Sequence, residues 1–198
     1  RDLIKTCSGT NRGLTTTNEE KTKIFDLLER LEELNPNPNP CDGLLDGTSP
    51  LEGEWQLLFT NALDVLSVGI VPAVYVGQVY QNVNYDGSEI TNIIDLQPGL
   101  APVLNPLIGS SVARLKVRAR GKVESSKRIA INFLSSELQP QTLLGRDITG
   151  LFSSLPPLKV EFPTQAPQPF GYVDTTYVDD EMRVARSLGE NLFVLIKV

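Results

Sequence analysis

From residue 53 to the C-terminus, short segments of alternating apolar and polar side chains follow one another, with turn-forming residues between them. The first segment places Trp55, Leu57 and Phe59 at every second position, and a period of two is typical of half-buried β-strands. Short strands at regular spacing, without helices between them, indicate an all-β barrel or sandwich. The pattern predicts nine strands, at about residues 53–60, 76–84, 89–96, 112–123, 128–134, 158–162, 172–178, 181–186 and 191–198.

The N-terminal segment, residues 1–34, has a helical pattern instead. Thr17 and Glu20 fit a capping box, and apolar residues then recur at three- and four-residue spacing from Ile24 to Leu34. The run Asn35–Pro40, which alternates Asn and Pro, stops this helix and reads as a linker. We therefore expect a helical segment with its linker over 1–46 and a barrel over 47–198, together forming one structural domain. The apolar stripe packs on the barrel in this interpretation; the alternative is a helix that docks a partner.

The composition excludes several kinds of chemistry, because the chain contains no histidine. Ser-His-Asp and Cys-His pairs, histidine-rich zinc sites and a histidine general base are therefore ruled out. The sequence shows neither a Walker A loop nor a G-x-G-x-x-G fingerprint. We expect no catalytic residues, no metal site and no cofactor. Cys7 and Cys41 are expected to be free thiols, although a single bridge between them stays open.

A row of cations lies on one face of the predicted strand at 112–123. Residues 112–128 hold seven Lys or Arg and one acid, Glu124, whereas the whole chain has 18 Lys+Arg and 24 Asp+Glu. The simplest interpretation is a solvated barrel exterior whose cations pair with acids such as Glu89, Asp95 and Glu137. The functional alternative is a surface that docks on anionic lipid or on an acidic partner. Nucleic acid is not expected, since no aromatic residues are interleaved with the cations. The candidate surface consists of Arg114, Lys116, Arg118, Arg120, Lys122 and Arg128.

Three connections between the predicted strands are unusually apolar, namely 61–74, 97–111 and 150–157. Loops usually run over the surface and are usually polar. Apolar loops at a barrel mouth are expected either to form helical turns that cover the barrel end or to face a ligand or membrane.

Six blocks of this sequence, in order along the chain, match the motifs of a known family. The first, L-E-G-E-W-Q-L-L-F-T at 51–60, contains the G-x-W pattern of lipocalin-type barrels. The others lie at 69–72, 77–81, 156–160, 176–186 and 191–195. In this order they resemble the plastid lipid-associated protein (PAP), or fibrillin, family, and the resemblance covers roughly residues 15–198. The sequence departs from the family at Ser187-Leu188, where a Gly is usual, and at Phe59, where Tyr is common.

This resemblance implies an all-β fold: a lipocalin-like antiparallel β-barrel of about eight to nine strands, with N-terminal α-helices packed on it. It also implies a plastid location (plastoglobule, thylakoid or stroma) after removal of a transit peptide that lies outside this chain. The implied ligands are prenyl lipids, carotenoids, quinones or fatty acids. In lipocalin-type barrels an arginine from a late strand packs on the G-x-W tryptophan, which would assign Arg183 or Arg186 to Trp55.

We therefore expect a non-catalytic protein that binds or carries a hydrophobic lipid and associates peripherally with membranes or plastoglobules. One alternative is a scaffold with a filled barrel that docks on membranes or on a lipid-metabolic enzyme. Another is an enzyme that uses Tyr, Lys or Asp in the cavity. Polar selectivity would come from Gln78, Gln81, Asn82, Arg183 and Arg186. The expected lipid-binding cavity consists of Trp55, Leu57, Phe59, Val79, Val83, Leu115, Val117, Ile131, Phe133, Tyr177, Arg183 and Arg186.

Overall fold

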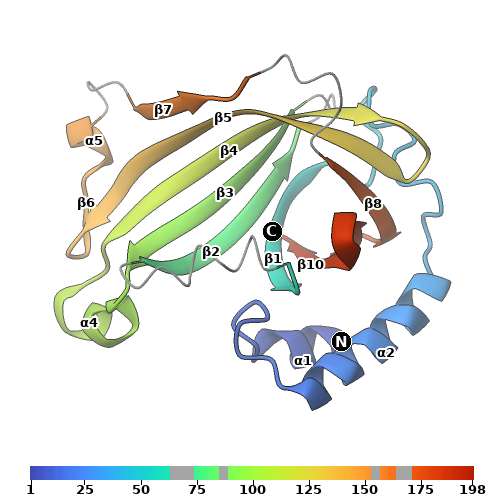
Figure 1. The fold of residues 1–198 in the computed structure, drawn as a ribbon, viewed down its shortest axis with the longest axis horizontal. Helices are drawn as coiled ribbons and strands as arrows, with labels where there is room; N and C mark the ends of the chain where they lie inside the picture. Colours follow the sequence, from blue (N-terminus) through green and yellow to red (C-terminus); the bar gives the residue numbers. More distant parts are fainter. Residues whose placement is uncertain (63–73, 85–88, 153–156, 164–170) are drawn as a thin grey trace.

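The computed structural model describes residues 1–62, 74–84, 89–152, 157–163 and 171–198, and it shows a closed antiparallel β-barrel (Figure 1). Eight strands form the ring in the order β4-β3-β2-β1-β10-β9-β8-β5, and pairing of β4 with β5 closes it. Each strand of the ring therefore has a hydrogen-bonded neighbour on both sides over at least part of its length. The ring strands are β1 (Gly53–Thr60), β2 (Val74–Val83), β3 (Glu89–Pro98), β4 (Val112–Val123), β5 (Arg128–Leu143), β8 (Gly171–Val178), β9 (Met182–Ser187) and β10 (Asn191–Lys197).

The predicted all-β barrel is thus confirmed, and one strand is longer than the sequence pattern indicated. Alternation ends at Leu134, but β5 continues to Leu143 because the twelve residues of β4 pair along its whole length. Pairing skips Leu134, so a bulge separates the two halves of β5. The long strands β2 to β5 run beyond the ring as a curved sheet, on which two short strands, β6 (Arg146–Asp147) and β7 (Leu158–Glu161), pair with β5 (Figure 1).

Two N-terminal helices cover one side of the barrel wall (Figure 1). They are α1 (Asp2–Ser8) and α2 (Asn18–Glu33), and the predicted capping box between Thr17 and Glu20 begins α2. Ile24 and Leu28 are fully buried, so the apolar stripe of α2 faces the barrel. Both helices share one core with outward-facing side chains of β1, β8, β9 and β10. Helices and barrel therefore bury a common apolar surface.

The apolar connections have different outcomes. Within the connection at 97–111, residues Ala101–Ile108 form α4, so the expected helical turns are present, but Val103 and Leu107 on this helix are exposed rather than packed on the barrel. The connection at 150–157 contributes to α5 (Thr149–Phe152), and its residues 153–156 lie outside the described residues. The connection at 61–74, from residue 63 to residue 73, and the predicted hairpin turn at 85–88 also lie outside them. A 3₁₀ turn, η2 (Leu188–Glu190), joins β9 to β10.

Candidate functional site

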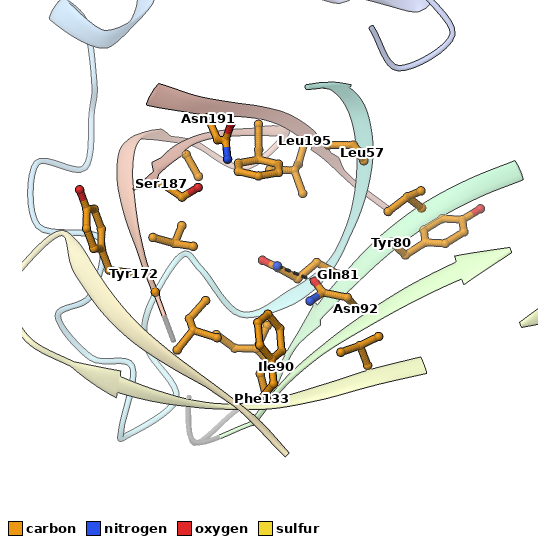
Figure 2. A pocket seen from close by; sticks show the side chains of 18 of the residues that line it. Leu57, Tyr80, Gln81, Ile90, Asn92, Phe133, Tyr172, Ser187, Asn191 and Leu195 are labelled. Atoms are coloured by element: carbon orange, nitrogen blue, oxygen red, sulfur yellow. Dashed lines mark hydrogen bonds between the residues drawn. The ribbon is translucent and has the colours of Figure 1, made fainter. Parts of the chain in front are cut away.

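The barrel encloses a cavity of about 410 Å³, to which all eight strands of the ring contribute side chains. This volume lies within the range of small-molecule sites in proteins. Figure 2 shows the lining side chains converging on the cavity from opposite walls. Most of them are apolar: Leu57, Val79, Ile90, Ile94, Val117, Ala119, Ile131, Phe133, Val173, Ala185, Leu188, Phe193 and Leu195.

Polar side chains are few in the cavity and fall at defined places. Gln81 and Asn92 point toward one another (Figure 2), and Gln81 Nε2 donates to Asn92 Oδ1 at 2.9 Å. Arg183 joins this pair, because its Nη1 donates to Gln81 Oε1 at 2.8 Å. The other polar lining residues are Tyr80, Tyr172, Ser187 and Asn191. Such a cavity suits an apolar molecule that carries a small polar group.

The closed end of the barrel is packed around Trp55, which has no exposed surface. The indole Nε1–H donates to the carbonyl oxygen of Leu51 at 2.9 Å, so its one polar group is satisfied. Leu44, Leu51 and Val178 belong to the same core. The cation over the indole ring is Lys197, whose Nζ lies 5.1 Å from a ring centroid of Trp55.

Only some of the residues that the sequence assigned to the cavity line it, and the others lie elsewhere in the barrel. Trp55 and Val83 belong to the packed core at the closed end. Leu115 lies farther along β4, paired with Ile94 and Leu138, and is not among the cavity-lining residues. Six of the expected residues line the cavity: Leu57, Val79, Val117, Ile131, Phe133 and Arg183.

Phe59 and Tyr177 correct the expectation from simple alternation, because both face away from the cavity into the core shared with α1 and α2. The cause is a register shift in each strand, between Leu57 and Phe59 in β1 and between Thr175 and Tyr177 in β8. A bulge inserts one extra residue, which reverses the alternation for the rest of the strand.

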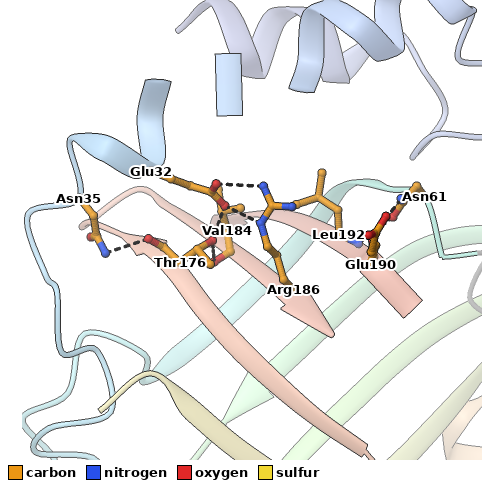
Figure 3. A network of polar contacts seen from close by, with 8 residues as sticks. All are labelled: Glu32, Asn35, Asn61, Thr176, Val184, Arg186, Glu190 and Leu192. Atoms are coloured by element: carbon orange, nitrogen blue, oxygen red, sulfur yellow. Dashed lines mark hydrogen bonds and ion pairs between the residues drawn. The ribbon is translucent and has the colours of Figure 1, made fainter. Parts of the chain in front are cut away.

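Arg186 also corrects the expectation, since it lies on the outer face of β9 and binds Glu32 of α2 (Figure 3). Its Nε and Nη2 donate to the two carboxylate oxygens, each at 2.9 Å. Thr176 of β8 donates its hydroxyl to the same carboxylate, and Asn35 donates to the carbonyl oxygen of Thr176 at 2.9 Å. This network fixes the C-terminal end of α2 to the barrel wall.

Replacing Glu32 with alanine is expected to lower the free energy of unfolding by about 1–3 kcal/mol, the cost of leaving a partly buried charged partner without its hydrogen bonds. Glu33→Ala is the matched control, because Glu33 is the exposed neighbour on the same helix. Urea denaturation followed by circular dichroism measures both. Equal stability of the two variants would contradict a fastening role for Glu32.

Several cavity residues were not identified from the sequence, although the same period of two would reveal them. Ile90, Asn92 and Ile94 alternate along β3, and Phe193 and Leu195 alternate along β10. The face that points inward becomes clear only once the pairing of these strands is known. Ala119 and Ala185 are too small to mark a face from sequence, yet their size leaves the cavity open.

Three of the six cations in the row on β4 and β5 form ion pairs with acids. Arg114 binds Asp95, Arg118 binds Glu89 and Arg128 binds Asp174, each through Nε and Nη2. The hydrogen bond that Arg114 donates to Asp95 raises the pKa of Arg114, and the one that Arg118 donates to Glu89 raises the pKa of Arg118. β4 lies between β3 and β5, so its charges do not guard a free edge.

An apolar surface gathers instead at the far end of the long strands. Ser110 accepts a hydrogen bond at 2.8 Å from the backbone N–H of Gly145, which joins the α4 segment to the β5–β6 turn. Val103 and Leu107 of α4 are 68% and 78% exposed. No charged residue occurs from 97 to 112. We call this surface the apolar end; it consists of Leu100, Val103, Leu104, Leu107, Ile108, Leu143 and Leu144.

Both cysteines are buried and unbonded. Burial raises the pKa of Cys7 to about 12 and that of Cys41 to about 11, so both are neutral thiols at pH 7. In the part of the chain that the structure describes, His, Cys, Asp and Glu do not form a group of three that could hold a metal ion. None of the helices in that part is both long and apolar enough to cross a bilayer.

A closed barrel of eight antiparallel strands around one apolar cavity defines a lipocalin-like barrel. The family model described as PAP_fibrillin matches residues 1–196, and the chain therefore belongs to the PAP/fibrillin family.

Relatives in plants match the full length of the chain. It is 31% identical to plastid lipid-associated protein 2 of Brassica campestris and 28% identical to chromoplast-specific carotenoid-associated protein C1 of an Oncidium hybrid cultivar. All of the chain aligns with each of them, and the alignments cover 67% and 68% of these relatives. The relatives are chloroplastic or chromoplastic, which confirms the predicted plastid localisation. No solved structure gives a significant match.

Proposed function

We propose that this plastid protein is a non-catalytic lipid-binding protein that holds one hydrophobic molecule in the barrel cavity. The observation that carries the proposal is the apolar cavity of about 410 Å³, lined by all eight strands. Burying a lipid tail there contributes roughly 0.8 kcal/mol for each CH₂ group. The names of relatives, which refer to lipids and carotenoids, support this class of ligand.

The chemistry of the cavity supports binding rather than catalysis. Its titratable lining residues are Tyr80, Tyr172 and Arg183, and its lining contains no Asp, Glu or Lys among the described residues. General acid–base catalysis usually depends on a group whose pKa lies near the working pH. The reference pKa values of arginine and tyrosine side chains lie well above 7, so these residue types are poor candidates for that role.

Blocking the cavity tests the proposal. Ala119→Phe places a ring in the space that Ala119 leaves open, and we expect uptake of a prenyl lipid, carotenoid or fatty acid to fall at least tenfold. Thr91→Phe is the matched control, because Thr91 follows Ile90, the partner of Ala119, and lies on the outer face of β3. Binding to delipidated protein is measured by titration, and bound lipid by mass spectrometry of solvent extracts. Thermal denaturation establishes that both variants are folded. The absence of saturable uptake by the wild type, or undiminished uptake by a folded Ala119→Phe variant, would contradict the proposal.

A second candidate function is attachment to a lipid surface through the apolar end. A helix with this many exposed apolar side chains is unusual on a monomer and is typical of an interaction site. The segment from 97 to 112 carries no charge, which suits the acyl region of a lipid layer better than an acidic or basic protein surface. Three arginines of the cationic row are already paired with acids, so we expect this row to contribute less to the attachment than the apolar end.

A further inference from the structure

The most unusual side chain in the cavity is Arg183, a cation that is only 2% exposed. It lies on β9 at the boundary between the open cavity and the packed closed end. Its hydrogen-bond partner, Gln81 of β2, lies opposite Trp55 of β1 in the sheet, and Trp55 belongs to the packed core. The guanidinium therefore sits at the floor of the cavity.

The neighbours of Arg183 accept hydrogen bonds from only some of its guanidinium donors. Nη1 donates to Gln81, whose oxygen is held in place because its amide nitrogen donates to Asn92. The Nε–H of Arg183 is buried without a hydrogen-bond partner among the residues that the structure describes. A buried donor without an acceptor costs about 1–3 kcal/mol, and more when the group is charged.

The positive charge of Arg183 also lacks a counter-ion. Within residues 1–62, 74–84, 89–152, 157–163 and 171–198, no carboxylate lies within 4.0 Å of its guanidinium. Cys41 interacts with it electrostatically, but burial keeps that thiol neutral at pH 7. Burial lowers the pKa of Arg183 to about 10, which still leaves it protonated at pH 7.

The other arginines show how this chain binds a carboxylate. Arg114, Arg118, Arg128 and Arg186 each present the edge formed by Nε and Nη2 to the two oxygens of Asp or Glu. This bidentate geometry matches carboxylate and phosphate groups. In Arg183 the hydrogen bond to Gln81 comes from Nη1, at the other end of the guanidinium. In Arg183, the edge formed by Nε and Nη2, which binds carboxylates in the other four arginines, therefore contains an Nε–H without an acceptor among the described residues.

We propose that the cavity selects a lipid with an anionic head group, a carboxylate or a phosphate, which binds at Arg183. This proposal rests on the proposed function and names the chemical class of its ligand. The head group accepts from Nε–H and supplies the missing negative charge at the cavity floor. The apolar lining above it, including Val117, Phe133 and Phe193, surrounds the hydrocarbon chain. The ligand therefore binds with its head group innermost.

Lipids that differ only in their head groups test the proposal on the wild-type protein. Palmitic acid and hexadecyl phosphate are compared with methyl palmitate and hexadecanol by titration of delipidated protein. We expect one of the two anions to bind at least tenfold more tightly than both neutral lipids, because charge-assisted hydrogen bonds are about twice as strong as neutral ones. The relative affinities of the two anions distinguish a carboxylate site from a phosphate site.

Substitution of the arginine completes the test. Arg183→Met is expected to abolish the difference in affinity between the anion and hexadecanol, whereas Arg183→Lys retains part of the preference. Arg146→Met is the control, because Arg146 is exposed on β6 and distant from the cavity. The carboxyl ¹³C resonance of labelled palmitate supplies a second readout on the wild type, since an ion-paired carboxylate titrates at lower pH than free palmitate.

Equal binding of anionic and neutral lipids by the wild type would overturn this proposal while leaving the lipid-binding function intact. A preference that survives in a folded Arg183→Met variant would do the same. Failure of all four lipids to bind would instead overturn both proposals.

Discussion

Replacing Trp55 with alanine is expected to lower the free energy of unfolding by about 3–5 kcal/mol, the usual cost of removing a fully buried large aromatic side chain. The indole is completely buried at the closed end of the barrel, among Leu44, Leu51 and Val178. The substitution leaves a cavity and also removes the donor to the Leu51 carbonyl oxygen. Since small domains are stable by about 5–15 kcal/mol, this change removes a large share of the total.

Two further variants separate the contributions to this loss. Trp55→Phe keeps most of the apolar volume but loses the hydrogen bond, and we expect a smaller cost of about 1–3 kcal/mol. Phe152→Ala is the control for an aromatic residue that is partly exposed on α5, and its cost is expected to stay below about 1 kcal/mol. Trp55 is the only tryptophan, so the Trp55 variants have no tryptophan fluorescence to report unfolding. Urea denaturation of all three variants is therefore followed by circular dichroism. A loss for Trp55→Ala no larger than that for Phe152→Ala would show that the closed end does not depend on the indole.

The strands could be predicted because their alternating pattern is local, whereas the bulges could not. Each bulge arises where one strand must bend to stay paired with its neighbour, and that neighbour can be far away in sequence. Phe59 and Val194, for example, are paired across the bulge in β1 although 134 intervening residues separate them. The orientation of Phe59 and Tyr177 therefore depends on contacts that no local pattern contains.

The two arginines of β9 illustrate the same limit. Arg183 and Arg186 are three residues apart, so alternation places them on opposite faces. One face of β9 lines the cavity and the other packs against α2, so the sequence alone could not decide which arginine lies inside the barrel. Helix α2 determines which arginine lies outside, because its Glu32 is on the outer side of β9 and binds Arg186.

The cationic row shows how pairing register changes the meaning of a charge pattern. In sequence, the strand at 112–123 carries five cations and no acid. In the barrel, Asp95 of β3 lies directly opposite Arg114, and Glu89 reaches Arg118 from the same strand. The acids come from a segment that precedes β4 by about 20 residues, so the balance of charge appears only when β3 and β4 pair.

If the apolar end attaches the protein to lipid, replacing both Val103 and Leu107 with glutamate is expected to weaken binding to lipid vesicles at least 100-fold. Each of these side chains would lose roughly 1.5–3 kcal/mol of apolar burial, and each tenfold change in affinity corresponds to about 1.4 kcal/mol. Both side chains are exposed, so the variant is expected to unfold at the wild-type urea concentration. Sedimentation with vesicles of neutral phosphatidylcholine measures the binding without any contribution from anionic lipid.

Two other pairs of substitutions distinguish the apolar end from the alternatives. Leu34→Glu with Leu45→Glu is the matched control, because these leucines are 75% and 77% exposed but belong to other segments. Arg118→Glu with Arg120→Glu reverses charge on the cationic row and is expected to reduce binding only to vesicles that contain anionic lipid. Attachment through the apolar end predicts binding to neutral vesicles that persists at high salt, since apolar burial is not screened. Binding that requires anionic lipid, falls with salt and is lost on reversal of the row would instead assign the attachment to the cations. Binding of the Val103, Leu107 variant to neutral vesicles at wild-type strength would exclude the apolar end.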